Sequence, residues 1–319
     1  MAATTSPGTT GSPGNTGSPG ITGPFPLTAG RRAALAIGVP VCLLLVAFTG
    51  FDLVQTLGNG KFPVRYTFPA QTRQVTVNSA GGNIAVRPAP HGPATLTGTA
   101  NYSLVRPDIS HRTTGSSTSF SLGCATGLLS CGLGATVGVP AATAVSVSTG
   151  GGGATATGIS GPVTLSSGGG NLSAGHTSGP LALSTDGGDI DVTAATSPAV
   201  TARSGGGNIT AAAVTSPSVT MTTDGGDIQV TALKSATTTA SSGGGNIEVA
   251  FSSVPRDVRV STSGGNITLL VPVGTTAYHV SAHTDGGTPT VTVPQNPASP
   301  NVITATTGGG NITIAEQAQ

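Results

Sequence analysis

The chain has 319 residues and a net charge of +1, and only 7% of its residues are charged. Lys and Arg together number 12, so the sequence lacks the basic surface that nucleic-acid binding requires. Aromatic residues make up 3% of the chain and Trp is absent, which excludes a thick globular core of large side chains.

Residues 1–30 are rich in Gly, Pro and Thr. Glycine recurs at every third position from Gly8 to Gly23, which is formally the collagen pattern. So short a run does not sustain a triple helix, and its composition is typical of a disordered segment. We expect a disordered cytoplasmic tail.

Residues 31–55 are predicted to be a transmembrane signal anchor. The stretch 33–51 carries no charge, and as a helix it spans about 28 Å, close to the ~30 Å hydrocarbon core of a bilayer. Arg31 and Arg32 precede it, which favours a cytoplasmic N-terminus and an extracytoplasmic C-terminal domain. A cleaved signal peptide is the alternative, although no small-x-small cleavage site follows the apolar run.

Residues 56–74 are interpreted as a linker with a first strand, and residues 75–319 as one β domain with an insertion at 87–143. The insertion contains Cys124 and Cys131, seven positions apart, which are candidates for a local disulfide if the domain lies outside the membrane. A metal site is the alternative, and it would need further ligands of the same kind nearby.

From Ser166 onward a glycine cluster, closed by Asn or Asp and followed by an aliphatic residue, returns about once every nineteen residues. The closing residues, with a looser copy at the end, are Asn171, Asp189, Asn208, Asp227, Asn246, Asn266 and Asn311. The steps between the first six are 18, 19, 19, 19 and 20 residues. Such a period is typical of stacked units that cannot bury an apolar face alone.

Each unit contains two short strand signals of period two. Patterns such as Leu181-x-Leu183 and Ile190-x-Val192 place both aliphatic side chains on one face of a strand. The glycine clusters are expected to supply turns with positive φ. The predicted fold is all-β: a parallel β-solenoid of ~19-residue rungs around a column of Val, Ile, Leu and Ala. A rung built from two units, about 38 residues, is the alternative.

Asn and Asp alternate at the corner over the five units from Asn171 to Asn246. If rungs stack about 4.8 Å apart, alternation doubles the distance between carboxylates and roughly halves their repulsion relative to an all-Asp column. Asn side chains also form hydrogen-bonded ladders in such stacks. We therefore expect a structural ladder along this corner.

The carboxylates are weak candidates for catalysis. Asp186, Asp189, Asp224 and Asp227 recur in register as part of the corner motif, where side-chain bonds to the backbone explain them, and only Asp191 stands outside it. No nucleophile, base and orienting group can be assembled from the spacing, so neither an enzymatic activity nor a cofactor is expected.

Metal binding has one further candidate. The segment GGDIDV at 187–192 resembles a turn of the calcium-binding β-rolls. The half-period positions lack the second Asp-bearing turn, so no metal site is predicted, and calcium at the Asp-rich corners is left open. The five His residues are scattered, and only His279 and His283 lie close together.

The stretch VPAATAVSVSTGGGGATATGISGPVTLSSGGGNL at 139–172 resembles the DUF4097 family of β-strand repeat proteins, often labelled adhesins. The likeness covers about 75–314 and rests on the SGxV-x-L and GGN/D-I-x-V patterns. It implies an extracytoplasmic bacterial β-solenoid, tethered to the membrane in many members and encoded beside envelope-stress regulators in some. Function inferred from such a fold is analogy.

We expect a single-pass protein of the bacterial cell membrane that acts without enzymatic chemistry as an adhesin-like or scaffolding protein. Its partner would be an envelope glycan or a protein, and its binding surface the Ser and Thr residues that alternate with the buried aliphatics. An accessory role in envelope-stress signalling through a protein partner is the alternative. A glycan-processing enzyme is a third hypothesis.

Overall fold

The computed structural model describes residues 59–89, 91–124 and 130–317, which all belong to one compact unit, Val54–Gln319. The expected tail at 1–30 and the expected anchor at 31–55 lie outside these residues. Within the described ranges, no helix has the length and apolar character needed to cross a membrane.

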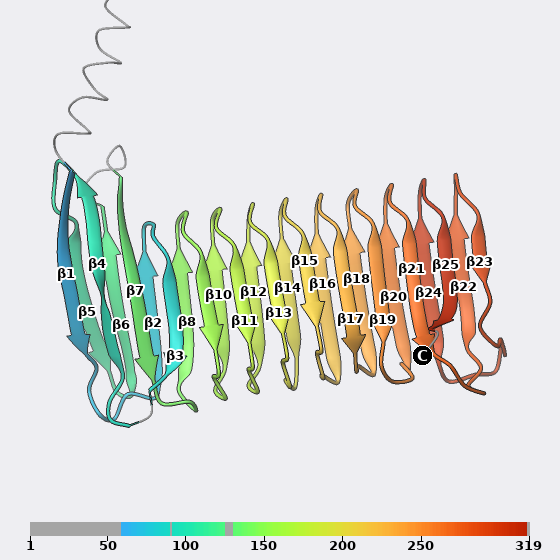
Figure 1. The fold of residues 1–319 in the computed structure, drawn as a ribbon, viewed down its shortest axis with the longest axis horizontal. Helices are drawn as coiled ribbons and strands as arrows, with labels where there is room; N and C mark the ends of the chain where they lie inside the picture. The colour runs from blue at the N-terminus through green and yellow to red at the C-terminus, as the bar shows by residue number, and fades with distance from the viewer. Residues whose placement is uncertain (1–58, 90, 125–129, 318–319) are drawn as a thin grey trace, which may run out of the picture. The chain divides into compact units, whose positions relative to one another are not determined.

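The regular structure of the described residues consists of strands in two facing sheets (Figure 1). Sheet 1 has 13 strands; in spatial order they are β1 (Asn59–Thr67), β4 (Thr95–Ser103), β7 (Cys131–Val139), β3 (Ile84–Pro88), β9 (Ala154–Thr157), β11 (Leu172–Gly175), β13 (Ile190–Thr193), β15 (Ile209–Ala212), β17 (Ile228–Leu233), β19 (Ile247–Phe251), β21 (Ile267–Pro272), β25 (Ile312–Gln317) and β23 (Pro289–Val291). Sheet 2 has 12; they are β22 (His279–Thr284), β24 (Val302–Thr307), β20 (Asp257–Thr262), β18 (Thr237–Ser242), β16 (Ser218–Thr223), β14 (Val200–Ser204), β12 (Leu181–Thr185), β10 (Val163–Ser167), β8 (Ala144–Thr149), β2 (Gln74–Ser79), β6 (Ser117–Gly123) and β5 (Asp108–Thr114).

From β8 to β21 the chain alternates between the sheets, and each pair of strands forms one rung. Every strand from β8 to β19 pairs in parallel with the strand two further along the chain: Val163 lies beside Leu181 and Val200 beside Val219, 18 and 19 residues apart. The expectation of a parallel β-solenoid with ~19-residue rungs is confirmed, and the alternative rung of about 38 residues is wrong.

The core is the column of aliphatic side chains between the two sheets. Ile209 and Ala211 of β15 are 0% exposed, whereas Thr210 between them faces solvent. Ile190 and Ile228 flank Ile209 in the neighbouring rungs. Because successive side chains of a strand point to opposite faces, the period of two buries one residue and exposes the next. Burial of one such aliphatic side chain contributes about 1.5–3 kcal/mol.

At the N-terminal end, rungs follow one another in space in a different order from the chain. β6 and β7 form a rung outside β2 and β3, because β2 pairs with both β6 and β8, and β3 with both β7 and β9. Beyond it, β1, β4 and β5 extend the sheets with antiparallel pairings. Residues 87–143, expected as an insertion, therefore contribute strands to both sheets at this end.

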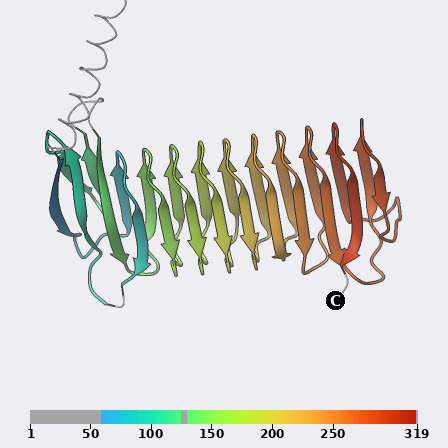
Figure 2. The ribbon, with the colours of Figure 1, turned by 45° about the horizontal axis from the view of Figure 1, so that its top comes forward.

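The C-terminal end has the same feature, which can be followed in Figure 2. β24 and β25 pair with β20 and β21 on one side and with β22 and β23 on the other. The last rung of the chain is thus enclosed between two others, while β22 and β23 form the open edge, where Val280 and Ala282 remain partly exposed. At the C-terminal end the edge is therefore formed by a segment that the chain continues past, whereas at the N-terminal end the first described strand, β1, forms the edge of sheet 1.

Candidate functional site

The glycine clusters form the corner that leads from sheet 2 into sheet 1. A Cβ added to Gly207, the last glycine of its cluster, would lie less than 3.0 Å from the carbonyl oxygen of Gly188 in the preceding rung, whereas a Cβ on Gly206 would meet nothing within 4 Å. The array needs glycine because the backbones of successive corners approach closely. The expectation that these glycines adopt positive φ is wrong: among the described clusters only Gly82 does so.

The Asn and Asp residues after the glycines form an outer ladder of hydrogen bonds. In each step the Oδ1 atom of one rung accepts the main-chain N–H of the next. The donor and acceptor pairs are Asp189 to Asn171 (2.9 Å), Asn208 to Asp189 (2.8 Å), Asp227 to Asn208 (2.8 Å), Asn246 to Asp227 (2.6 Å), Asn266 to Asn246 (2.9 Å), Asn311 to Asn266 (2.8 Å) and Thr288 to Asn311 (2.9 Å). The seven residues singled out from the sequence thus lie in one line along the corner.

The carboxylates of this corner bind its own backbone. Asp189 and Asp227 each accept a main-chain N–H, and Asn208 lies between them. Asp186 and Asp224 are exposed and belong to those same two rungs. Among the residues that the structure describes, no three His, Cys, Asp or Glu side chains converge in a group that could hold a metal ion.

An inner ladder of hydroxyl groups runs parallel to the outer one. The Oγ atom of Ser204 donates to the carbonyl oxygen of Gly188 in the preceding rung (2.8 Å) and accepts the N–H of Gly207 (2.9 Å). The same two bonds are made by Ser167, Thr185, Thr223, Ser242, Thr262, Thr307 and Thr284. Sequence reasoning missed these residues, although a Ser or Thr always stands three positions before the last glycine of the cluster.

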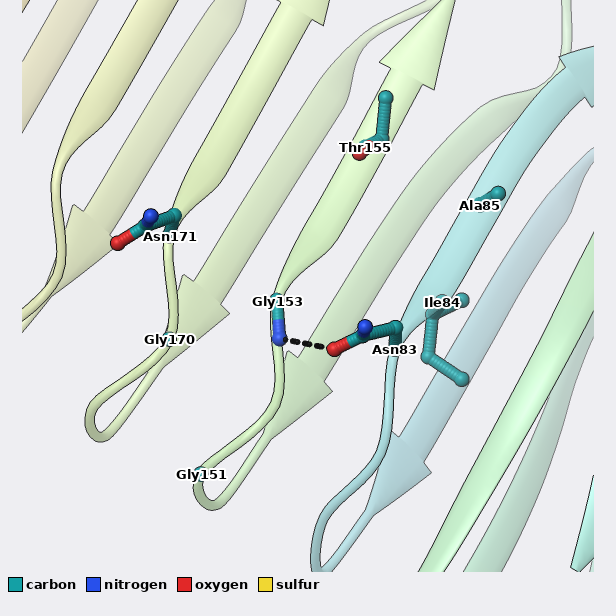
Figure 3. A pocket seen from close by; sticks show the side chains of 8 residues that line it. All are labelled: Asn83, Ile84, Ala85, Gly151, Gly153, Thr155, Gly170 and Asn171. Atoms are coloured by element: carbon teal, nitrogen blue, oxygen red, sulfur yellow. Dashed lines mark hydrogen bonds between the residues drawn. The ribbon is translucent and has the colours of Figure 1, made fainter.

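The outer ladder is interrupted at Gly153, which stands where other rungs have Asn or Asp (Figure 3). In the preceding rung, Oδ1 of Asn83 accepts the main-chain N–H of Gly153 (2.9 Å). Gly153 has no side chain to accept the N–H of Asn171, and this N–H makes no hydrogen bond to another of the described residues. A hollow of about 450 Å³ opens at this point, bordered also by Thr155.

The outward side of sheet 2 carries two neighbouring columns of aligned side chains, which we call the hydroxyl face. In spatial order the first column is Ser119, Thr76, Ser146, Thr164, Ala182, Thr201, Thr220, Thr239, Arg259, Thr304 and Ser281. The second is Ser121, Asn78, Ser148, Ser166, Ser184, Arg203, Thr222, Ser241, Ser261, Thr306 and His283. Strand spacing places neighbours in each column about 4.8 Å apart.

The remaining candidate residues lie apart from these features. Cys124 and Cys131 form a disulfide with their Cα atoms 5.6 Å apart, beside β7 at the N-terminal end. His279 and His283 lie on the edge strand β22, and His283 contacts Asp285 (3.1 Å). At the same end, burial raises the pKa of Tyr278, and the charge of Glu316 raises this pKa further.

The architecture defines the class of protein: an all-β, parallel-stranded solenoid whose corners are linked by Asx and hydroxyl ladders. The sequence matches the family model described as Toastrack DUF4097 over residues 137–315, and the chain belongs to this family. No match to a curated protein was found.

Solved structures with similar strand arrangements come from three bacteria. They are a candidate adhesin from Bacteroides fragilis (14% identity, TM-score 0.41), one from Parabacteroides merdae (10%, 0.30) and a candidate cell adhesion protein from Clostridium sporogenes (11%, 0.28). Each match covers 81% of this chain. It covers 97%, 96% and 100% of the other chain, in the same order. The family assignment rests on the sequence match alone.

Proposed function

We propose that this chain is a non-enzymatic binding protein of the bacterial cell envelope, held at the membrane by residues 31–55, and that the hydroxyl face is its binding surface. One observation carries the proposal: two aligned columns present side-chain hydroxyls at a constant interval along nearly the whole solenoid. The first column lacks a hydroxyl only at Ala182 and Arg259.

A surface of this kind suits an extended, repetitive partner. A hydroxyl both donates and accepts hydrogen bonds, and short side chains lose little conformational entropy when they are ordered. Each contact is worth little alone, but regularly spaced contacts along one rigid face add up for a polymer that engages many at once. The chemistry fits an uncharged stretch of envelope polysaccharide, which is itself rich in hydroxyl and ether oxygens.

Sedimentation of the full chain, purified in detergent, with cell-wall polysaccharide tests the proposal. The double variant Thr201→Glu/Thr220→Glu introduces carboxylates at the centre of the hydroxyl face. We expect it to lose at least tenfold in affinity.

The matched control is Thr210→Glu/Thr231→Glu, which places the same charges on the outward side of sheet 1 in adjoining strands. We expect this control to bind like the unaltered protein. Equal binding by both variants would contradict the role of the hydroxyl face, and release of reducing sugar from the polysaccharide would contradict a non-enzymatic role.

The membrane anchor is tested separately. We expect the chain to fractionate with membranes, and the solenoid to be digested by protease added to spheroplasts. A chain recovered in the soluble fraction after cell lysis would contradict the anchor without affecting the binding surface.

A further inference from the structure

We propose that the break in the outer ladder at Gly153 is a binding site for a carboxamide, and that its ligand is the acetamido group of an N-acetylated amino sugar. The site lies at a corner, away from the hydroxyl face, and does not depend on the function proposed above.

In the step from Asn246 to Asn266, two donors converge on one oxygen. The main-chain N–H and the Nδ2 atom of Asn266 lie 2.9 and 3.3 Å from Oδ1 of Asn246. The step from Asp227 to Asn246 repeats this arrangement at 2.6 and 3.4 Å. Asn246 and Asn266 thus present two donors toward the rung before them, whereas Asn208 and Asn311 present the main-chain N–H alone.

Asn171 has no such oxygen in front of it, because Gly153 occupies the preceding rung. The Oδ1 atom of Asn171 already accepts the N–H of Asp189, and Figure 3 shows this oxygen turned away from Gly153. Figure 3 shows the amide nitrogen of Asn171 on the same side as this oxygen, away from Gly153, so the main-chain N–H of Asn171 is the donor left for an acceptor placed in the break. Asn171 is exposed, so water can bond to this N–H in the free protein, and a bound acceptor would take the place of that water.

The opposite wall of the break carries an acceptor. Oδ1 of Asn83 points toward Gly153 and accepts its N–H, and a carbonyl oxygen has a second lone pair for another donor (Figure 3). A main-chain N–H on one side and an acceptor on the other match the C=O and N–H of an amide. A carboxylate would satisfy Asn171, but it would face the oxygen of Asn83 without a proton to donate.

The surroundings favour a sugar over a peptide as the carrier of this amide. The hollow of about 450 Å³ exceeds the space that an amide group alone needs. Besides the residues already named, its lining consists of Gly151, Gly170, the exposed Thr155 and the half-buried Ala85, while Ile84 is 1% exposed. Backbone polar groups and a hydroxyl can bond to the hydroxyls of a pyranose ring, but they offer no apolar pocket for a peptide side chain.

The test is a titration of the full chain in detergent, followed by saturation-transfer NMR and by the amide resonance of Asn171. The probes are N-acetylglucosamine, glucose, glucuronate and N-acetylalanine amide. We expect N-acetylglucosamine to bind and to shift the Asn171 resonance, and each of the other three to bind at least tenfold more weakly. Preference for N-acetylalanine amide would contradict the sugar and indicate a peptide. Preference for glucuronate would contradict a carboxamide ligand, and equal binding of glucose would contradict recognition of the acetamido group.

Two variants link the binding to the break. Gly153→Asn supplies the missing side chain, and we expect at least a tenfold loss of affinity; Gly206→Asn, at an open glycine of another corner, is the matched control and should bind normally. A Cβ on Gly153 would lie 2.9 Å from the carbonyl oxygen of Asn171, so a second variant is needed in case this one does not fold. Asn83→Ala removes the acceptor wall and should weaken binding several-fold. Unchanged affinity in a folded Gly153→Asn or Asn83→Ala protein would overturn the site.

Discussion

In the three rungs from β12 to β17 the two corners use glycine and alanine in the reverse of the usual way. At the corner from sheet 2 into sheet 1, the glycines of the array have no positive φ, and a side chain on the last of them would collide with the rung before it. At the opposite corner the backbone does adopt positive φ, yet the residues there are Ala194, Ala213 and Ala232, with φ of 49°, 55° and 52°, and the two preceding rungs have Gly158 (69°) and His176 (52°) at this position. Glycine is placed where backbones approach closely, and left-handed residues are tolerated where the stack holds them in place.

The tolerance has a measurable cost. A left-handed conformation costs a residue with a Cβ about 1–2 kcal/mol. Parallel pairing helps to offset this cost, because Ala213 donates its N–H to Thr231 of the next rung and Ala194 donates its N–H to Ala212. Crowding at the glycine corner has no such compensation, since a displaced backbone would break bonds to both neighbouring rungs.

The largest effect is expected from the core that both corners share. Ile209→Asp places a carboxylate at a position that is 0% exposed, between Ile190 and Ile228. We expect a loss of about 4 kcal/mol or more in the free energy of unfolding, because nothing there pairs with the charge. Urea denaturation measures this loss, and Thr210→Asp on the outward side of the same strand serves as the control. A protein with Ile209→Asp that kept its unfolding midpoint would show that the inward face is wrongly assigned.

Two neighbouring glycines of one cluster test why the glycine corner needs glycine. Gly207→Ala should destabilise the protein by about 3 kcal/mol, because its Cβ meets the backbone of Gly188. Gly206→Ala should change the free energy of unfolding by less than about 0.5 kcal/mol, since its Cβ enters open space. Equal losses from the two substitutions would mean that glycine is needed here for its flexibility.

The outer ladder should contribute less. Asn208→Ala leaves the N–H of Asp227 without its acceptor, at an exposed position where water can replace it. We expect a loss of about 1 kcal/mol in urea denaturation. Ser204→Ala removes two buried bonds of the inner ladder and should cost more than Asn208→Ala. The reverse order would assign the greater role to the outer ladder.

The smallest effect is expected at the alanine corner, and it has the opposite sign. Ala213→Gly relieves the left-handed backbone and should stabilise the protein by about 0.5 kcal/mol, after allowing for the greater entropy of unfolded glycine. The control Ala212→Gly, in the preceding strand residue, should destabilise it by about 0.5–1 kcal/mol. Destabilisation by both would show that the positive φ carries no strain.

The period and the alternation of aliphatics were enough to predict the parallel solenoid, the rung length and the line of Asn and Asp residues. They did not predict β18, in which Thr238 and Ala240 occupy the inward positions, because these residues give no aliphatic pattern and only the period places the strand. The order of rungs at the two ends was also beyond the pattern. The glycine clusters that end at Thr288 and Asn311 look alike in sequence. The rung of the second cluster nevertheless stacks before the rung of the first, and this order depends on the path of the connecting loops.

The candidate site was predictable only in part. The alternation of Asn and Asp pointed to the outer ladder, and it also accounts for the two-unit period that suggested a longer rung. The reason for the glycines could not be read from the sequence, because close approach and positive φ favour the same residue. The break at Gly153 became meaningful only once the register placed it between Asn83 and Asn171.

The central claim is that successive corners stack one rung apart, and distances between spin labels test it most directly. With Cys42 replaced by serine, labels are placed on Gly169 and on one of the middle glycines Gly244, Gly264, Gly309 or Gly286, where no atom would lie within 3.4 Å of an added Cβ. The stack predicts separations of about 19, 24, 29 and 34 Å in that order, so the label at 309 lies nearer than the label at 286. Separations that do not grow by a constant step, or a label at 286 nearer than the one at 309, would contradict the account.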